Sequence, residues 1–461
     1  MSDHMFQIPE PWEISKLPEI ADINMGQSPS SSDVNEHGEG IVFFQGKAEF
    51  GKLYPTPKKY CTKPTKIASA GDILLSVRAP VGPTNLANQS TAIGRGLAAI
   101  SAYHGLMESK YLLYFFKCIE PWLSTQGTGS TFKAISGQFI RDLQSPVPPL
   151  AEQKIIAEKL DTLLAQVDST KVRLEQIPQI LKRFRQAVLT FAMNGELTKE
   201  WRSQNNNSAF FSAEKNSLKQ FRNKELPSIP NNWSWMRFDQ VADIASKLKS
   251  PLDYPNTIHL APNHIESWTG KASGYQTILE DGVTSAKHEF YTGQIIYSKI
   301  RPYLCKVTIA TFDGMCSADM YPINSKINTH FLFRWMLTST FTDWASNAES
   351  RTVLPKINQK DLSEIPVPTP PLPEQAEIVR RVEQLFAYAD TIEKQVNNAL
   401  ARVNNLTQSI LAKAFRGELT AQWRAENPDL ISGENSAAAL LEKIQADRAA
   451  NGGKKASRKK S

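Results

Sequence analysis

Apolar residues recur at alternating spacings of three and four in two stretches of the chain. The first stretch runs from Leu160 to Phe191, and the second from Val382 to Ile410. Apolar residues kept at this spacing over four heptads are typical of a coiled coil. Each stretch predicts a helix of about 35–40 residues, which at 1.5 Å per residue is about 55 Å long.

The two stretches occupy matching positions, because adding 222 to a residue of the first series gives a residue of the second. Thr170 and Lys413 are the two members that are not apolar. An amphipathic helix that packs on a globular core would show the same spacing of apolar residues. The register shared by the two stretches favours the packing of one helix against the other. An antiparallel pair would have pseudo-twofold symmetry, although the heptads alone also allow a parallel pair. The predicted contact positions are Leu160, Leu163, Val167, Leu174, Leu181, Phe184, Val188, Val382, Leu385, Ile392, Val396, Val403, Leu406 and Ile410.

Two short motifs bracket both helices. The phrase "PVPPLAEQKI" at 146–155 returns as "PVPTPPLPEQAEI" at 366–378, and "NGELTKEWR" at 194–202 returns as "RGELTAQWR" at 416–424. The prolines permit a helix to start just after them, and Gly195 and Gly417 stand where a helix C-cap glycine belongs. Pro178 falls inside the first helix, and an interior proline predicts a kink or a split there.

The segments before the helices repeat less closely. "IPEPWEISKLPEIADI" at 8–23 matches "IPNNWSWMRFDQVADI" at 229–244, and "GDILLSVRAP" at 71–80 resembles "GQIIYSKIRP" at 293–302. The fold class is therefore α+β: two mixed α/β domains separated by two long helices that pair as an antiparallel coiled coil, in an internal pseudo-twofold repeat. The expected order is a domain (1–147), a helical region (148–202), a polar linker (203–224), a second domain (225–367), a second helical region (368–424) and a tail (425–461) with a short helix and a disordered basic end.

Composition narrows the class of protein only slightly. The 461 residues carry a net charge of +7, which permits a nucleic-acid partner, although part of the excess lies in the last ten residues. The four cysteines, Cys61, Cys118, Cys305 and Cys316, form no CxxC pair and are expected to be free thiols. The N-terminus has no signal-peptide core and no apolar run reaches membrane-spanning length, so we expect a soluble cytoplasmic protein without a membrane partner.

The two helical regions have nearly the same sequence, whereas the two domains differ. This difference predicts that the helices set the distance between the domains and that each domain binds a different part of a ligand. Two unlike readers at a fixed separation suit two half-sites on double-stranded DNA, which lie about 34–36 Å apart or a multiple of it. Arg78 and Arg301 stand out because each follows a matching strand, whereas each remaining cation is individually better explained as solvated surface charge. Tyr303 and Phe132 are interpreted as core residues. The candidate DNA contacts are Lys47, Arg78, Arg95, Lys133, Lys299, Arg301, Lys306, Arg351 and Lys356.

The sequence contains none of the motifs expected of an enzyme acting on nucleic acid. There is no GxxxxGK[ST] phosphate loop, "GTGS" at 127–130 is a plain loop, and no Asn-Pro-Pro-aromatic element for a flipped amino base occurs. His259 and His264 are interpreted as ordinary polar residues. We therefore predict neither catalytic residues nor a metal site.

The motifs together resemble one family closely. The repeated PPL-x-EQ, the long helix after it and the closing "GELT…WR" are similar to the conserved regions of the specificity subunits of type I restriction–modification enzymes, in their enterobacterial family A branch. "GDILLSVRAPVG" and "GSTFKAIS" resemble phrases of that family's target recognition domains. The resemblance covers essentially the whole chain.

The resemblance implies a non-catalytic subunit that binds no cofactor itself. Each target recognition domain would read one half of a bipartite, asymmetric DNA sequence, and the helices would set the unread spacer. The helical regions would dock two methyltransferase subunits, which use S-adenosylmethionine at adenine. Two motor-nuclease subunits, which use ATP and Mg, would join to cut unmodified DNA.

Two other classes of protein stay open on the residues alone. A fused methyltransferase-nuclease is disfavoured by the missing motifs. A coiled-coil adaptor could instead bind protein ligands through its two domains.

Overall fold

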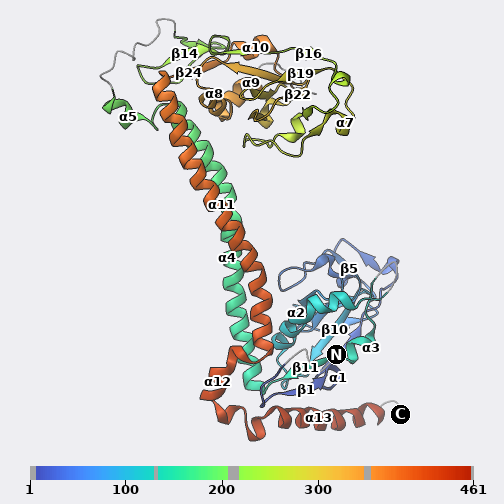
Figure 1. Ribbon diagram of the computed structural model, residues 1–461. Coiled ribbons are helices and arrows are strands. Elements are labelled where there is room, and N and C mark those ends of the chain that lie inside the picture. Colours follow the sequence, from blue (N-terminus) through green and yellow to red (C-terminus); the bar gives the residue numbers. More distant parts are fainter. Residues whose placement is uncertain (1–6, 129–132, 206–216, 347–354, 458–461) are drawn as a thin grey trace. The chain divides into compact units, whose positions relative to one another are not determined.

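The chain forms two compact units, each made of pieces from both halves of the sequence. In this computed structural model, unit 1 comprises residues 1–175 and 398–461, and unit 2 comprises residues 176–397. The structure describes residues 7–128, 133–205, 217–346 and 355–457, with no side chains beyond residue 450. Each unit holds one domain, one half of α4 (Leu150–Met193) and one half of α11 (Leu372–Phe415) (Figure 1).

The domain of unit 1 is built on three sheets. A four-stranded antiparallel sheet has the order β2-β10-β7-β8, and a five-stranded sheet has the order β3-β5-β4-β9-β6, in which β4 and β9 are parallel. Strands β1 and β11 pair separately and bring the start of the chain beside the segment that enters α4. The strands are β1 (Glu13–Lys16), β2 (Ala21–Met25), β3 (Val34–Asn35), β4 (Ile41–Phe44), β5 (Lys59–Cys61), β6 (Ile67–Ala68), β7 (Ile73–Ser76), β8 (Thr84–Leu86), β9 (Thr91–Ile93), β10 (Leu97–Ala102) and β11 (Gln144–Val147).

The domain of unit 2 repeats this topology except at the first strand of its five-stranded sheet, since β16 pairs with β19 at one edge whereas β3 pairs with β5 at the other. Its sheets have the orders β15-β23-β20-β21, β16-β19-β22-β17-β18 and β14-β24, and β17 and β22 are the parallel pair. A small hairpin, β12 (Gln220–Phe221) with β13 (Lys224–Glu225), is added within the predicted linker. The strands are β14 (Ser234–Arg237), β15 (Ala242–Ile244), β16 (Leu248–Lys249), β17 (Ile258–Leu260), β18 (Gln276–Thr277), β19 (Lys287–Phe290), β20 (Ile295–Ser298), β21 (Val307–Ile309), β22 (Gly314–Ser317), β23 (Met320–Ser325) and β24 (Pro366–Thr369).

The shorter helices lie around these sheets or follow the ends of the long helices. In unit 1 they are α1 (Leu17–Ile20), α2 (Ser109–Gln126), α3 (Gly137–Arg141), α12 (Ala421–Glu426) and α13 (Ala437–Ser457), with 3₁₀ turns η1 (Ser31–Asp33), η2 (Lys47–Glu49), η6 (Glu418–Thr420), η7 (Pro428–Leu430) and η8 (Gly433–Asn435). In unit 2 they are α5 (Lys199–Gln204), α6 (Phe238–Val241), α7 (Ile278–Asp281), α8 (Thr329–Met336), α9 (Ser339–Ser346) and α10 (Gln359–Ser363), with η3 (Pro251–Asp253), η4 (Pro262–His264) and η5 (Pro302–Leu304).

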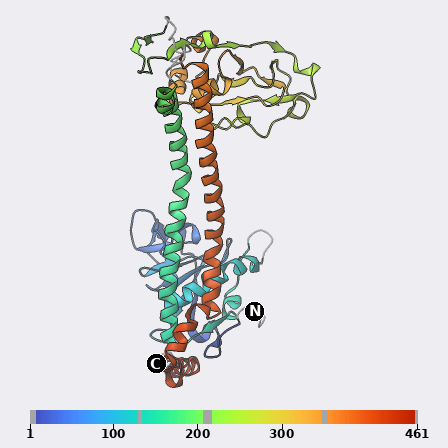
Figure 2. The ribbon, with the colours of Figure 1, turned by 60° about the vertical axis from the view of Figure 1, so that its left-hand side comes forward.

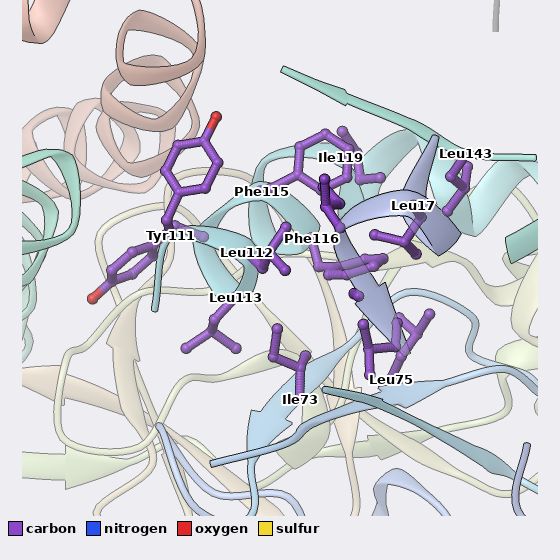
Figure 3. Packing of buried hydrophobic residues seen from close by; sticks show 14 of the residues in the cluster. Leu17, Ile73, Leu75, Tyr111, Leu112, Leu113, Phe115, Phe116, Ile119 and Leu143 are labelled. Carbon is purple, nitrogen blue, oxygen red and sulfur yellow. The ribbon is translucent and has the colours of Figure 1, made fainter. Parts of the chain in front are cut away.

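The core of the first domain lies between α2 and the four-stranded sheet. Figure 3 shows Leu113 and Phe116 of α2 facing Ile73 and Leu75 of β7, and all four side chains are fully buried. The second domain splits the equivalent helix into α8 and α9, because the Thr338 hydroxyl accepts a hydrogen bond from the Phe341 N–H and caps a new helix.

The long helices pair antiparallel within each unit. In unit 1 the start of α4 lies beside the end of α11, and the Lys159 ammonium donates to the Leu419 carbonyl at 3.1 Å. In unit 2 the end of α4 lies beside the start of α11, and the Arg185 guanidinium donates to Asp390 at 2.6 Å and to Glu393 at 2.8 Å. Within each unit the two helices run side by side in both ribbon views (Figures 1 and 2). The predicted fold class is confirmed.

The predicted contact positions of the coiled coil are mostly withdrawn from solvent. Leu406 is the exception, with 44% of its surface exposed, and Phe191 of the same periodic series is 53% exposed. The helix ends turn different residues inward, since Leu189, Ala192 and Met193 are buried together with their counterparts Leu411, Ala414 and Phe415. The ends therefore pack on the domains instead of continuing the heptad contact. The positions that the structure buries fully are Leu160, Val167, Leu181, Val188, Val382 and Val396, and those it buries partly are Leu163, Leu174, Phe184, Leu385, Ile392, Val403 and Ile410.

Pro178 does not split the first helix, so that part of the prediction is wrong. Helix α4 is continuous from Leu150 to Met193 with Pro178 inside it. Pro178 is exposed, whereas Leu181 on the next turn is buried, with 6% of its surface exposed. Tertiary packing of this kind offsets the cost of about 3 kcal/mol for an interior proline.

The linker and the tail contain more structure than the sequence indicates. Leu218, Phe221 and Leu226 of the linker hairpin pack on the core of the second domain, while residues 206–216 lie outside the described part. In the tail, α13 buries Leu440 and Ile444 against the first domain. This helix continues past residue 451, where the sequence predicts the basic end to begin, and the last four residues are not described.

Each long helix begins with a buried carboxylate that joins three segments of its unit. Glu152 is fully buried and accepts hydrogen bonds from the Trp12 indole at 2.9 Å, the Thr420 hydroxyl at 2.6 Å and the Arg424 guanidinium at 2.6 Å. The first strand region, the start of α4 and the segment after α11 are thereby tied together. A buried charge is tolerated only when it is paired and hydrogen-bonded in this way.

The second unit repeats the arrangement with equivalent residues. Glu374 is fully buried and accepts from the Trp233 indole at 3.0 Å, the Thr198 hydroxyl at 2.8 Å and the Arg202 guanidinium at 2.9 Å. Asn232 adds a further donor to Glu374 at 3.1 Å. The repeated motifs are thus explained: the EQ phrase of one copy binds the GELT…WR phrase of the other.

Candidate nucleic-acid interface

Two candidate cations of the first domain meet where β7 ends. Arg78 follows β7 and forms a β-bridge with Ala134, and the Ala79 N–H donates to the Lys133 carbonyl at 2.9 Å. Both Arg78 and Lys133 are exposed. Two segments that are distant in sequence therefore lie next to each other, and each carries an exposed cation.

The other two candidates of this domain lie at the same edge. Arg95 is exposed in the turn between β9 and β10, and the Gly96 carbonyl accepts from the Val77 N–H beside Arg78. Lys47 begins η2, directly after a segment whose backbone packs against Gly94 and Gly96. Four exposed cations at the ends of β4, β7 and β9 form what we term the first basic edge: Lys47, Arg78, Arg95 and Lys133.

In the second domain, the segments equivalent to those of Arg78 and Lys133 carry Arg301 and Lys356. The Arg301 N–H donates to the Pro355 carbonyl at 2.8 Å, and Ile300 forms a β-bridge with Lys356. Both cations are exposed, and we term them the second basic edge. Arg351, another candidate, lies outside the described residues.

Lys299 and Lys306 differ from these exposed cations because each already has an internal partner. The Lys299 ammonium lies 5.3 Å from the centre of the Tyr321 ring, and the Lys306 ammonium donates to the Pro262 carbonyl at 2.6 Å. Both side chains are partly buried. Lys306 thus supports the loop around Pro262, and Lys299 is oriented by an aromatic ring.

The two basic edges use the same backbone but not the same positions. Matching hydrogen bonds make Ala79 equivalent to Arg301, and matching bridges make Arg78 equivalent to Ile300. Arg78 and Arg301, which both follow the matching strand, are therefore one position apart, as the offset of 222 residues also gives. Arg301 also has a left-handed backbone conformation, with φ of 47°, so the two edges carry their charges at different positions.

Ion pairs fasten the first domain to α4. Asp161 accepts a hydrogen bond from the Lys110 ammonium at 2.5 Å and another from the Tyr114 hydroxyl, and the Asp161 partner raises the pKa of Lys110. Lys52 pairs with Asp168 at 2.5 Å. A cavity of about 850 Å³ between these contacts is lined by both basic and acidic groups, including Lys47, Lys117, Glu120 and Asp168. Its mixed charge does not favour an anionic ligand.

The described residues provide little that resembles an enzyme site. No group of three or more His, Cys, Asp or Glu side chains among them is placed to hold a metal ion. His259 is buried and paired with Asp281 at 2.7 Å, an arrangement that holds β17 to α7. Within the same described part of the chain, no helix is long and apolar enough to cross a membrane.

The duplicated plan, with two diverged domains each fixed to the ends of paired helices, is the plan of a known class of DNA specificity proteins. The family model described as "Type I restriction modification DNA specificity domain" matches residues 9–179 and 230–402, once for each copy. The chain belongs to this family and is a specificity subunit of a type I restriction–modification system.

Particular relatives support this membership. The chain is 71% identical over 455 residues to the type I restriction enzyme EcoDI specificity subunit of Escherichia coli, covering 99% of both chains. It is 40% identical to the EcoBI specificity subunit of Escherichia coli, over 99% of this chain and 96% of that one.

Solved structures of low sequence identity share the fold. The HsdS subunit from Thermoanaerobacter tengcongensis superimposes with a TM-score of 0.59 at 17% identity, covering 91% of this chain and all of that one. A structure concerned with complex assembly and conformational transition of the type I R-M system gives 0.60 at 17%, covering 90% of this chain and all of that one.

The sequence analysis did not identify the tryptophans that bind the buried carboxylates, and it did not predict that Tyr303 is exposed. The indoles of Trp12 and Trp233 bind the buried carboxylates, and the recurrence of tryptophan at matching positions of both copies was the available signal. Tyr303 was assigned to the core but is 50% exposed, because the loop that carries it turns the ring outward. Phe132, assigned in the same way, lies outside the described residues.

Proposed function

We propose that each domain reads one half of a bipartite, asymmetric DNA target through its basic edge, while the paired helices set the length of the unread spacer. The observation that carries this proposal is that equivalent backbone segments of the two edges carry their cations one position apart. One backbone presenting two charge patterns suits two different half-sites. Exposed Arg and Lys side chains are the groups that bind guanine edges and phosphates.

The junctions around Glu152 and Glu374 support the spacing role. Each junction ties a domain to the ends of both long helices, so a domain cannot drift along its helix without breaking a buried ion pair. A rigid separation of the readers is what a fixed spacer requires.

We further propose that the helical regions dock two methyltransferase subunits, and that two motor-nuclease subunits join them. These partners would supply S-adenosylmethionine, ATP and Mg chemistry, and this subunit would supply no reacting group. The complex would act in the cytoplasm, where the DNA is. The relatives named as specificity subunits of type I enzymes support this assignment.

The test is to express the chain with its methyltransferase subunit and to map methyladenine across the genome. A single bipartite motif with a constant spacer is the expected result. Methylation without such a motif would contradict the reading role and favour the adaptor alternative.

A second test concerns the spacer alone. Removing one heptad from each helix at matched positions should shorten the spacer and leave both half-sites unchanged. An altered half-site would show that the helices also take part in reading.

A further inference from the structure

The loop between β20 and β21 differs from its counterpart in the first domain. It comprises residues 299–306, whereas residues 77–83 join β7 to β8, so the second domain has one additional residue here. Val81 in the shorter loop is 3% exposed and belongs to the core, whereas Tyr303 in the longer loop is 50% exposed. The extra residue thus exchanges a buried aliphatic side chain for an aromatic ring at the surface.

The backbone of this loop is held in an unfavourable conformation. Arg301 and Cys305, on either side of η5, both have φ of 47°, in the left-handed region that non-glycine residues rarely adopt. Such conformations persist only where the surroundings impose them, and they cluster at binding sites.

Contacts on several sides impose the conformation. Pro302 and Cys305 are buried, and the Cys305 N–H donates to the Pro302 carbonyl at 2.8 Å. The Cys305 carbonyl in turn accepts from the Trp268 N–H at 3.1 Å, and η5 packs on α9. The backbone on both sides of Tyr303 is therefore held in place by contacts within the domain.

The surroundings of Tyr303 suit a nucleic acid. Arg301 lies two residues before it, and Lys356 lies on the segment bridged to Ile300, so the ring stands beside the second basic edge. A tyrosine ring gives an apolar face to a thymine methyl group or to a base, and a rigid ring loses little entropy on binding.

We propose that Tyr303 is a specificity-determining residue of the second domain, whose ring contacts a base within the half-site read by that domain. This inference rests on the proposed function, because it presupposes that the domain reads DNA. The ring, and not the hydroxyl group, makes the contact.

The experiment maps methyladenine with the methyltransferase subunit and chain variants. Tyr303→Ala should relax at least one base of one half-site by about tenfold or more, and this half should be the one changed by Arg301→Ala. Tyr303→Phe should keep the wild-type motif. The matched control is Tyr291→Ala, which removes a 52% exposed tyrosine near the opposite end of β20 and should leave the motif intact.

Several outcomes would overturn the proposal. An unchanged motif in Tyr303→Ala would do so, as would relaxation in Tyr303→Phe or a uniform loss of methylation at all sites by an assembled complex. If the Tyr303→Ala variant fails to assemble with the methyltransferase subunit, the same measurement is made with Tyr303→Gln, which replaces the ring with a polar side chain. A wild-type complex without a bipartite motif would instead refute the proposed function itself.

Discussion

The two junctions and the two basic edges of this chain have diverged to very different degrees. At the junctions, every group around Glu152 recurs around Glu374: an indole, a hydroxyl and a guanidinium. At the edges, the backbone hydrogen bonds recur but the cations move by one position and one loop gains a residue. A buried charge leaves almost no freedom to substitute its partners, whereas an exposed edge can change its side chains at little cost to folding.

The largest expected effect tests whether the junctions are equivalent. Glu152→Ala and Glu374→Ala each leave a mostly buried arginine without its partner, so each should lower the free energy of unfolding by about 3–5 kcal/mol. Thermal or urea unfolding measures this loss. Exposed Glu158→Ala on the same helix is the control and should change stability by less than about 0.5 kcal/mol. Losses for the two carboxylates that differ by more than about 2 kcal/mol would refute the equivalence.

A smaller effect is expected at the contact between the long helices. Leu181 is 6% exposed, so Leu181→Ala should destabilise the protein by about 2–4 kcal/mol through the cavity it leaves. Leu406 is 44% exposed, and Leu406→Ala should cost less than about 1 kcal/mol. Unfolding curves of the two variants measure both losses in the free energy of unfolding. Equal losses would mean that Leu406 is buried in the protein.

The indoles sharpen the same comparison. Trp12→Phe and Trp233→Phe keep an aromatic ring but remove the donor to the carboxylate, which should cost about 1.5–3 kcal/mol. Glu374 retains the Asn232 donor at 3.1 Å, so Trp233→Phe should be the milder change. Melting temperatures of both variants measure the difference, and a harsher effect of Trp233→Phe would contradict this account.

Moving a cation by one position tests the divergence of the edges. The double change Ile300→Arg and Arg301→Ala gives the second domain the pattern of the first, and should alter binding to its half-site by about 1–3 kcal/mol. Methylation of duplexes that vary in one half-site provides the measurement. An equal loss on every duplex would indicate phosphate contacts, and an unchanged preference would mean that the displacement has no role in reading.

The smallest effect distinguishes the copies by pH. Hydrogen bonds from Arg380, and then Arg381, lower the pKa of Glu377 from 4.5 to about 2, and the first copy has Ile155 at this position. A lowered folded-state pKa gives stability that is present above pH 4.5 and is lost as pH falls toward 2. Because Arg380 is largely exposed, the contribution should be below about 1 kcal/mol. Glu377→Gln should flatten the decline of the melting temperature below pH 4.5, and an unchanged decline would refute this assignment.

The sequence was a good guide wherever a pattern was periodic or repeated. Heptads report a local spacing of side chains, so they predicted two long helices, and the 222-residue offset predicted that the domains share a topology. It was a poorer guide at Pro178, where α4 is continuous, and at Leu406, which the periodic series predicted to be buried but which is 44% exposed. Packing partners distant in sequence decide such positions.

The sequence by itself determined the duplicated plan of domain and helix, because periodicity and repetition are carried by neighbouring residues. Only the tertiary structure decided that the EQ phrase of one copy binds the closing phrase of the other, and that Arg301 adopts a left-handed backbone conformation. Both depend on which strands and helix ends meet in space. Segments that are distant in the sequence make these contacts, so no local pattern reports them.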